Sequence, residues 1–341
     1  MMNRRRLLVL GLGGATTGML PGALQAKETD PAQERPFRVL MFTFRGQTDV
    51  ERGFQDYLAS RNVKAEFRIL DVSGDVSKVG SLLATSLPDF RPDLIYTNGT
   101  PLTLAVAGPY DAPANAGFIR DIPVVFALVA APVQVKIVPS LASSERNVTG
   151  AVHIVPTDVQ LRAMQNYRPF DNVGVLYSAN ERNAVAIVDE VKSFCANSGA
   201  RMTARPLPFT GAKADPDAVA ALVRDIRQAG AQWLYLPPDS ALATVFQRVA
   251  EEAIRENLPT FGSTEFFLRA GPGLVGLVSR YYSVGQLAGS KAVDILTQGA
   301  NPQTLPIEKL KRFSLIINMK VAKQIGAYPP ISMLNYADII T

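Results

Sequence analysis

The stretch FRVLMFTFRGQTDVERGFQDYLASR, residues 37–61, contains a complete pattern of strand, turn and helix. Residues 37–44 are rich in apolar, aromatic and β-branched side chains, which is typical of a strand. Thr48 is followed three residues later by Glu51, the spacing of a capping box, so we expect a helix over residues 49–61. A strand that leads directly into a helix is the unit from which parallel α/β sheets are built.

The same alternation continues along the chain in two series. The first series contains expected strands at 37–44, 65–71, 94–97 and 124–128, and helices at 49–61, 77–87 and 101–108. The second begins after Gly150 and contains expected strands at 173–177, 202–207, 233–236 and 260–262, and helices at 158–167, 181–198, 217–229 and 241–256. Such alternation indicates βαβ units. We therefore predict an α/β fold with two Rossmann-like lobes, each built on a parallel sheet.

The chain continues beyond the second series. Further elements are expected at 274–279 (strand), 284–296 (helix), 313–318 (strand) and 320–325 (helix). Three passages between the lobes, near 138–150, 265–272 and 304–312, would account for this layout. They give an N-terminal lobe of residues 36–140 plus 270–305 and a C-terminal lobe of residues 145–265 plus 306–341. Three such connections would form a hinge on which the lobes close around a ligand.

Residues 1–26 have the pattern of an export signal that is removed after use. Arg4, Arg5 and Arg6 precede an apolar run over 7–20, and a small residue, Ala26, follows where a signal peptidase could cut. The run is shorter than the roughly 20 residues that a transmembrane helix needs. Asn3 and the arginines also resemble a twin-arginine signal. We therefore expect a soluble periplasmic protein.

The composition argues against several other functions. Loss of residues 1–26 lowers the formal net charge from +5 to +2, and the remaining Lys and Arg form no basic stripe, so we expect no nucleic-acid partner. One His and one Cys cannot supply a zinc site, and no Ser, His and acid arrangement can be built. We expect no enzyme activity, cofactor or metal, a hydrogen-bonded structural role for His153, and a buried thiol at Cys195.

Several helix starts point to the expected ligand site. Thr48, Thr157 and Ser283 each precede Glu or Gln by three residues, and Thr100 precedes Pro101. In a parallel sheet, helix N-termini lie beyond the carboxyl ends of the strands, where their free N–H groups favour anionic ligands. Aromatic side chains are expected at the same edge: Phe44, Tyr96, Phe126, Tyr177, Tyr281 and Tyr282. Flat rings there could enclose an aromatic ligand while amides and hydroxyls hold its carboxylate.

Separate segments of the chain carry a family resemblance when taken in order. They are DIPVVF (121–126), NVTG (147–150), VGVLY (173–177) and LIINMK (315–320) with Ala322 and Lys323. Over about residues 37–327 they resemble the ABC transporter substrate-binding proteins related to the tryptophan and tyrosine binders. The resemblance implies a type I periplasmic binding protein with two α/β lobes and three hinge strands.

The resemblance also implies ligand-binding positions in the cleft between the lobes. They are Thr100, Pro101, Asn180, Asn183, Asp239, Ser240, Thr264, Glu265, Tyr281 and Tyr282. Phe44 joins them from the aromatic pattern. At Ala131 the family usually has Asp, so a carboxylate that could pair with a ligand ammonium is missing. This departure weighs against recognition of an α-amino acid.

These observations together favour a solute receptor. The expected protein is a monomer that captures a small aromatic or carboxylate-bearing solute and delivers it to an inner-membrane ABC permease and its ATPase. The alternative is a periplasmic ligand-sensing subunit that signals to a membrane kinase or cyclase through the same closing lobes.

Overall fold

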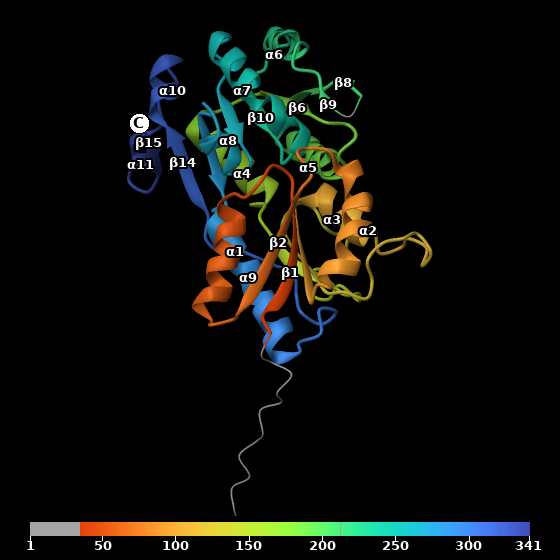
Figure 1. Ribbon diagram of the computed structural model, residues 1–341. Helices are drawn as coiled ribbons and strands as arrows, with labels where there is room; N and C mark the ends of the chain where they lie inside the picture. The colour runs from red at the N-terminus through yellow and green to blue at the C-terminus, as the bar shows by residue number, and fades with distance from the viewer. Residues whose placement is uncertain (1–34, 212) are drawn as a thin grey trace, which may run out of the picture. The chain divides into compact units, whose positions relative to one another are not determined.

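The computed structural model describes residues 35–211 and 213–341. The predicted export signal at 1–26 lies outside these residues. Residues Pro36–Thr341 form one compact unit, which contains two large β-sheets with helices packed against them (Figure 1). The predicted α/β fold with two lobes is confirmed.

The first lobe is built on a parallel sheet, which has six strands among the described residues. In spatial order these are β13 (Glu308–Lys309), β5 (Val148–Val152), β4 (Val124–Val129), β3 (Leu94–Asn98), β1 (Phe37–Thr43) and β2 (Ala65–Asp71). Side chains alternate between the faces of a strand, so Val39 and Met41 join one buried cluster while Leu40 and Phe42 join another. Both faces of this sheet are therefore covered.

Two pairs of helices provide that cover. Helices α1 (Asp49–Ser60) and α9 (Tyr281–Gln298) pack on the Val39 face, while α2 (Val79–Phe90) and α3 (Thr100–Ala107) pack on the other (Figure 1). The capping box predicted at the start of α1 is present. The Thr48 side chain lies at the Glu51 N–H, and the Glu51 carboxylate accepts a hydrogen bond from the Thr48 N–H.

Helices α1 and α9 approach closely because glycines stand at their contact. A Cβ atom added to Gly53 would lie 2.0 Å from the Tyr282 carbonyl oxygen, and one added to Gly285 would lie 2.0 Å from the Val50 carbonyl oxygen. A Cβ atom added to a third glycine, Gly289, would lie 2.9 Å from Cβ of Tyr57 and 3.0 Å from the Phe54 carbonyl oxygen. No larger residue fits between these backbones without separating the helices.

The second lobe is built on a sheet with seven strands among the described residues. In spatial order these are β15 (Asp338–Ile340), β14 (Ser314–Asn318), β12 (Val275–Val278), β11 (Thr260–Gly262), β10 (Trp233–Leu236), β6 (Asn172–Tyr177) and β7 (Arg201–Pro206). Neighbouring strands are parallel except β12 and β14. The predicted parallel sheet is thus confirmed, with one antiparallel pair towards its edge.

Helices cover both faces of this sheet as well. The helices α4 (Thr157–Tyr167) and α5 (Arg182–Ser198) share a buried cluster with Trp233, and α6 (Val219–Gln228) and α7 (Ser240–Arg255) share another with Leu234. The smaller elements are η2 (Val76–Lys78), β8 (Phe209–Thr210), β9 (Lys213–Ala214), α8 (Phe266–Arg269), α10 (Met319–Gln324) and α11 (Ile331–Leu334). Of the helices at 35–211 and 213–341, none combines the length and apolar character needed to cross a bilayer.

The chain passes between the two sheets later than the sequence suggested. β5 pairs with β4, so the first passage is at 153–156 rather than near 138–150. β12 belongs to the second sheet, so the second passage is at 279–280 and not near 265–272. β13 pairs with β5, so the third is at 310–313. Strand pairing therefore moves 148–152 and 308–309 into the first lobe and 275–278 into the second, against the predicted boundaries.

Three predicted helix caps are wrong. Gly99 is the N-cap of α3, and Thr100 is the first residue of the helix. Pro156 precedes α4, and the Thr157 hydroxyl donates to the Glu190 carboxylate at 2.5 Å instead of capping the helix. Helix α9 begins at Tyr281, two residues before Ser283. Cys195 is a buried free thiol, as expected.

The contact between α1 and α9 yields a first prediction. Gly285→Ala should lower the free energy of unfolding by about 1–3 kcal/mol, because the new Cβ collides with the backbone of α1. The matched control is Gly80→Ala in α2, where nothing lies within 4 Å of an added Cβ. This control should be neutral or stabilise by about 0.5–1 kcal/mol, since alanine is the better helix former. Urea unfolding measures both, and equal effects would contradict the close approach.

Candidate functional site

A small cavity of about 70 Å³ lies where residues of both lobes meet. Its walls are formed by Arg45, Asn98, Gly99, Thr100, Leu128, Ala130, His153, Asn183, Pro238, Asp239, Ser240, Ala243, Thr264, Phe266, Phe267 and Tyr281. Polar side chains predominate, which is the character of a site that orients a polar solute.

The first lobe contributes residues that follow the carboxyl ends of its parallel strands. Arg45 comes two residues after β1, Asn98 ends β3, Ala130 follows β4 and His153 follows β5. Parallel strands end at one edge of a sheet, so these four positions converge. This placement is the one that the sequence predicted for the ligand site.

The second lobe contributes the corresponding edge of its own sheet. Asp239 lies between β10 and α7, Thr264 lies between β11 and α8, and Asn183 lies in the first turn of α5 after β6. Tyr281 is the first residue of α9, directly after a passage between the lobes. The cavity is thus lined by both sheets and by one of their connections.

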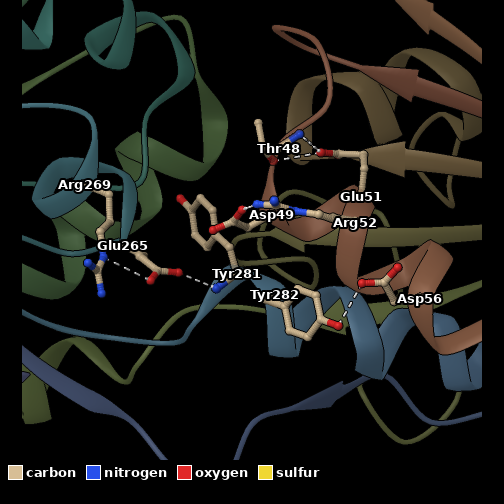
Figure 2. A network of polar contacts seen from close by, with 9 residues as sticks. All are labelled: Thr48, Asp49, Glu51, Arg52, Asp56, Glu265, Arg269, Tyr281 and Tyr282. Carbon is tan, nitrogen blue, oxygen red and sulfur yellow. Dashed lines mark hydrogen bonds and ion pairs between the residues drawn. The ribbon is translucent and has the colours of Figure 1, made fainter. Parts of the chain in front are cut away.

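Asn98 is held in place by a buried carboxylate. Glu51 is fully buried and accepts hydrogen bonds from the Asn98 side chain at 2.5 Å, the Tyr96 hydroxyl at 3.1 Å and the Thr48 N–H at 2.8 Å. Figure 2 shows the Thr48 contact. The capping box of α1 therefore also orients a residue of the cavity wall.

Asp239 also stabilises the walls of the cavity through hydrogen bonds. Its carboxylate accepts hydrogen bonds from the Ser178 N–H at 2.6 Å, the Ser178 hydroxyl at 2.8 Å and the Leu242 N–H at 2.8 Å. It thereby caps α7 and joins the end of β6 to it. Burial raises the pKa of the Asp239 carboxyl above its usual value.

Glu181 completes the N-terminus of α7. Its carboxylate accepts hydrogen bonds from the N–H groups of Ser240 at 3.0 Å and Ala241 at 2.8 Å. Burial and, secondarily, the nearby Asp239 raise the pKa of Glu181 to about 8, although the two N–H donors act in the opposite direction.

Glu265 fixes the start of α9 (Figure 2). It is buried and accepts a hydrogen bond from the Tyr281 N–H at 2.5 Å, and it forms ion pairs with Arg280 at 3.1 Å and Arg269 at 3.7 Å. The Tyr281 hydroxyl is hydrogen-bonded with Thr264, and burial raises the pKa of this phenol. Tyr281 is therefore held in the cavity wall from both its ends.

The Tyr282 side chain does not line the cavity. Its hydroxyl donates to the Asp56 carboxylate on α1 at 2.9 Å, and the residue is exposed (Figure 2). Adjacent residues at the start of a helix face different directions. The two neighbouring tyrosines consequently differ in role, and only Tyr281 lines the cavity.

His153 is buried and uncharged at neutral pH. Burial lowers its pKa to about 4, although a hydrogen bond to the Val129 backbone acts in the opposite direction. Nδ1 is buried without a hydrogen-bond partner. The hydrogen-bonded structural role predicted for His153 is therefore not found at this nitrogen.

Arg45 is the cation of the cavity wall. Its guanidinium lies over the Phe266 ring, 4.3 Å from the ring centroid, and 5.7 Å from that of Phe44. The residue as a whole is exposed, yet enough protein surrounds the guanidinium to lower its pKa. Arg45 thereby connects the first lobe to α8 of the second.

The structure brings six of the twelve predicted site residues to the cavity. These are Thr100, Asn183, Asp239, Ser240, Thr264 and Tyr281. The others, Phe44, Pro101, Ala131, Asn180, Glu265 and Tyr282, are not among its lining residues. Ala131 instead lines a neighbouring hollow of about 1270 Å³, and Glu265 lines another of about 570 Å³.

The wall also contains residues that the sequence did not single out. Arg45, Asn98, Phe266 and Phe267 are the main ones. Of the rings expected at the strand ends, Tyr96 and Phe126 are fully buried in the core and do not line the cavity. Thr100 is at the wall as predicted, but its hydroxyl exchanges hydrogen bonds with the Ala130 backbone at 3.0 and 3.3 Å.

No group of three or more His, Cys, Asp or Glu side chains within 35–211 and 213–341 is arranged to hold a metal ion.

The fold and the cavity define a two-lobed solute-binding protein. The family model for the ABC transporter substrate binding protein matches residues 45–340. The chain therefore belongs to this family, whose members are solute-binding proteins rather than enzymes and generally act outside the cytoplasm.

Individual relatives agree with this assignment. The chain is 24% identical to the tyrosine-binding protein of Clostridioides difficile (strain R20291) over 95% of its own length and 93% of that protein. Its fold is similar to that of the ABC domain from Streptococcus pneumonia solved in complex with L-Trp, with a TM-score of 0.76, 22% identity and coverage of 90% of this chain and 100% of that one. A conserved domain protein from Vibrio cholerae has a TM-score of 0.78, 22% identity and the same coverage.

The protonation of Glu181 yields a second prediction. A folded-state pKa of about 8, above the unfolded value of 4.5, means that the folded protein binds a proton that the unfolded chain releases between these values. The raised pKa of Glu181 therefore favours the folded state at low pH, and this contribution to the free energy of unfolding is lost as the pH rises towards 8. Glu181→Gln should remove this loss while an amide oxygen still accepts a hydrogen bond from the start of α7.

Unfolding free energies at pH 5, 6, 7 and 8 test this prediction. Wild type should lose more stability across the series than the Glu181→Gln variant. Glu251→Gln, an exposed position on α7, is the matched control and should follow wild type. Parallel profiles for wild type and Glu181→Gln would contradict a raised pKa at this site.

Proposed function

We propose that this protein is the periplasmic receptor of an ABC uptake transporter. It captures a small organic solute in the cavity between its lobes and delivers it unchanged to an inner-membrane permease with its ATPase. The observation that carries the proposal is the cavity itself, which is lined by the strand ends of both sheets in a chain of the substrate-binding family. Closure of two lobes on a solute is the general mechanism for this architecture.

The proposed solute bears a carboxylate and can carry an aromatic body. Two relatives support the aromatic part, since one is named for tyrosine binding and another was solved with L-Trp. The rings of Phe266, Phe267 and Tyr281 in the wall offer flat surfaces for such a body. Arg45 and the N-terminus of α3 support the acid group, since both favour negative charge.

The site residues proposed from sequence remain part of this proposal where they reach the cavity. Thr100, Asn183, Ser240, Thr264 and Tyr281 stand in its wall. Asp239 is proposed to act indirectly, because its carboxylate is already bonded to Ser178 and the start of α7. We propose that the receptor acts as a monomer, since one chain supplies both walls.

A third prediction tests the function. Native mass spectrometry of the protein purified from the periplasm of its own host should show a retained solute, and the freed solute should raise the melting temperature when returned. Binding to the folded state alone stabilises by about 2.7 kcal/mol at a ligand concentration 100 times Kd. Deletion of the gene should reduce uptake of that solute.

Normal uptake combined with loss of a transcriptional response would favour the sensing alternative. A protein that retains no solute and leaves uptake of every tested acid unchanged would contradict the receptor function.

A fourth prediction concerns export, which we propose follows the twin-arginine route. Replacement of Arg4 and Arg5 by lysine should leave the precursor in the cytoplasm, because this route requires the arginine pair. Cell fractionation with immunoblotting measures the distribution. Arg6→Lys, just outside the pair, is the matched control and should be exported; export of the double variant would indicate the general secretory route.

A further inference from the structure

Arg45 carries a positive charge into the cavity wall without a bound carboxylate. Among the described residues, its guanidinium contacts the rings of Phe266 and Phe44 and has neither a hydrogen bond nor an ion pair with another side chain. Glu181 and Tyr281 lie within electrostatic range of it, but burial raises the pKa of each, so both are largely uncharged at neutral pH. Guanidinium groups have five N–H donors, so this residue has unused donors beside the cavity.

The carboxylates near the cavity are already occupied. Asp239 accepts three hydrogen bonds, and Glu181 accepts two from backbone N–H groups. Glu51 and Glu265 accept donors from their own surroundings in the same way. A ligand ammonium would therefore lose its water and meet only acids that already accept hydrogen bonds from the protein, which is costly.

His153 supplies an unused acceptor. A neutral imidazole has one protonated ring nitrogen and one with a lone pair, and we assign the lone pair to the nitrogen that has no protein partner. That nitrogen, Nδ1, is buried, and the residue is 5% exposed and lines the cavity. A buried acceptor without a partner costs free energy, so a donor on the solute would satisfy it.

The Tyr281 side chain lies near both His153 and Arg45. Its ring meets that of His153 edge-on, with the centroids 6.0 Å apart, and its hydroxyl lies within electrostatic range of Arg45. All three line the same cavity of about 70 Å³, which is enough for a head group and not for an aromatic body. Phe266 and Tyr281 also line the adjacent hollow of about 570 Å³, which is large enough for such a body.

We infer that the head group bound here is that of a hydroxycarboxylate: the carboxylate is held by Arg45, the hydroxyl donates to Nδ1 of His153, and the solute has no ammonium group. This inference rests on the proposed function and specifies its solute class. It assigns specificity to Arg45 and His153, neither of which was among the predicted ligand-binding residues.

The fifth prediction is a ranking of matched probes. In isothermal titration calorimetry, 3-phenyllactate should bind more tightly than 3-phenylpropanoate, by about two- to tenfold, because only the former has the hydroxyl. Phenylalanine should bind about tenfold or more weakly than 3-phenyllactate. Lactate, propanoate and alanine form a second series with a smaller body and should follow the same order if they bind.

Four variants at two positions test which group binds which part of the solute. Arg45→Gln should weaken both phenyl acids by about tenfold or more and leave their ratio unchanged, while Arg45→Lys should retain part of the affinity. His153→Phe should reduce the ratio of the two acids to about one. His153→Asn, which keeps an acceptor near the Nδ1 position, should preserve part of the ratio. Melting temperatures check that each variant folds.

A measurement on the unaltered protein supports the variants. His153 is the only histidine of the chain, so ¹⁵N-histidine labelling of untagged protein gives signals from one imidazole. Saturation with 3-phenyllactate should shift the Nδ1 resonance as it accepts a hydrogen bond, and 3-phenylpropanoate should shift it less. An unchanged Nδ1 resonance would overturn the role of His153.

The outcomes separate this inference from the receptor function. Phenylalanine or alanine binding as tightly as the matching hydroxy acid would overturn the inference and leave the receptor function standing. Failure of both hydroxy acids to bind would do the same if native mass spectrometry still finds a retained solute. A retained solute that is a zwitterion or a cation would also overturn it.

Discussion

The close approach of helices α1 and α9 is the contact on which the cavity depends. Gly53 and Gly285 allow the two backbones to meet, because a side chain at either position would occupy the space of a carbonyl group. Helix α9 directly follows the passage from the second lobe and packs on the sheet of the first, so this contact determines where its first residue lies. That residue is Tyr281, which stands in the cavity wall together with Arg45, located between β1 and α1.

Buried acids form the framework around this cavity. Glu51 orients Asn98, Asp239 and Glu181 complete the start of α7, and Glu265 holds the start of α9. Each carboxylate satisfies N–H groups that a helix cannot satisfy by itself. Polar residues near a cleft are often taken as ligand contacts, but here several of them build the walls instead. The guanidinium of Arg45 and Nδ1 of His153 are two groups of the wall with unused hydrogen-bonding capacity.

The sequence predicts the lobes well because each strand and helix of the two series has a local pattern of its own. It predicts the passages between lobes poorly, since a strand as short as β13 (Glu308–Lys309) shows nothing of the sheet that it joins. Thr100 and Asp239 can be identified as wall residues because ligand sites lie at the carboxyl ends of parallel strands. That argument does not show that their polar groups already form hydrogen bonds within the protein. Arg45 follows β1 and could have been found by the same argument. Whether a nitrogen of His153 has a hydrogen-bond partner depends on residues distant in the sequence, so the sequence does not show it. Tyr281 and Tyr282 could be separated only once the helix start was known.

The hydrogen bonds that the buried acids already form affect how inorganic anions compete with the solute. A cavity whose own negative charges are bonded internally presents a positive field to anything that enters, and charge alone does not distinguish an organic acid from an inorganic anion. Chloride and sulfate can both approach a guanidinium, but neither carries a proton to donate to a neutral imidazole. Discrimination against mineral ions would then depend on the small volume of the head-group space together with Nδ1 of His153.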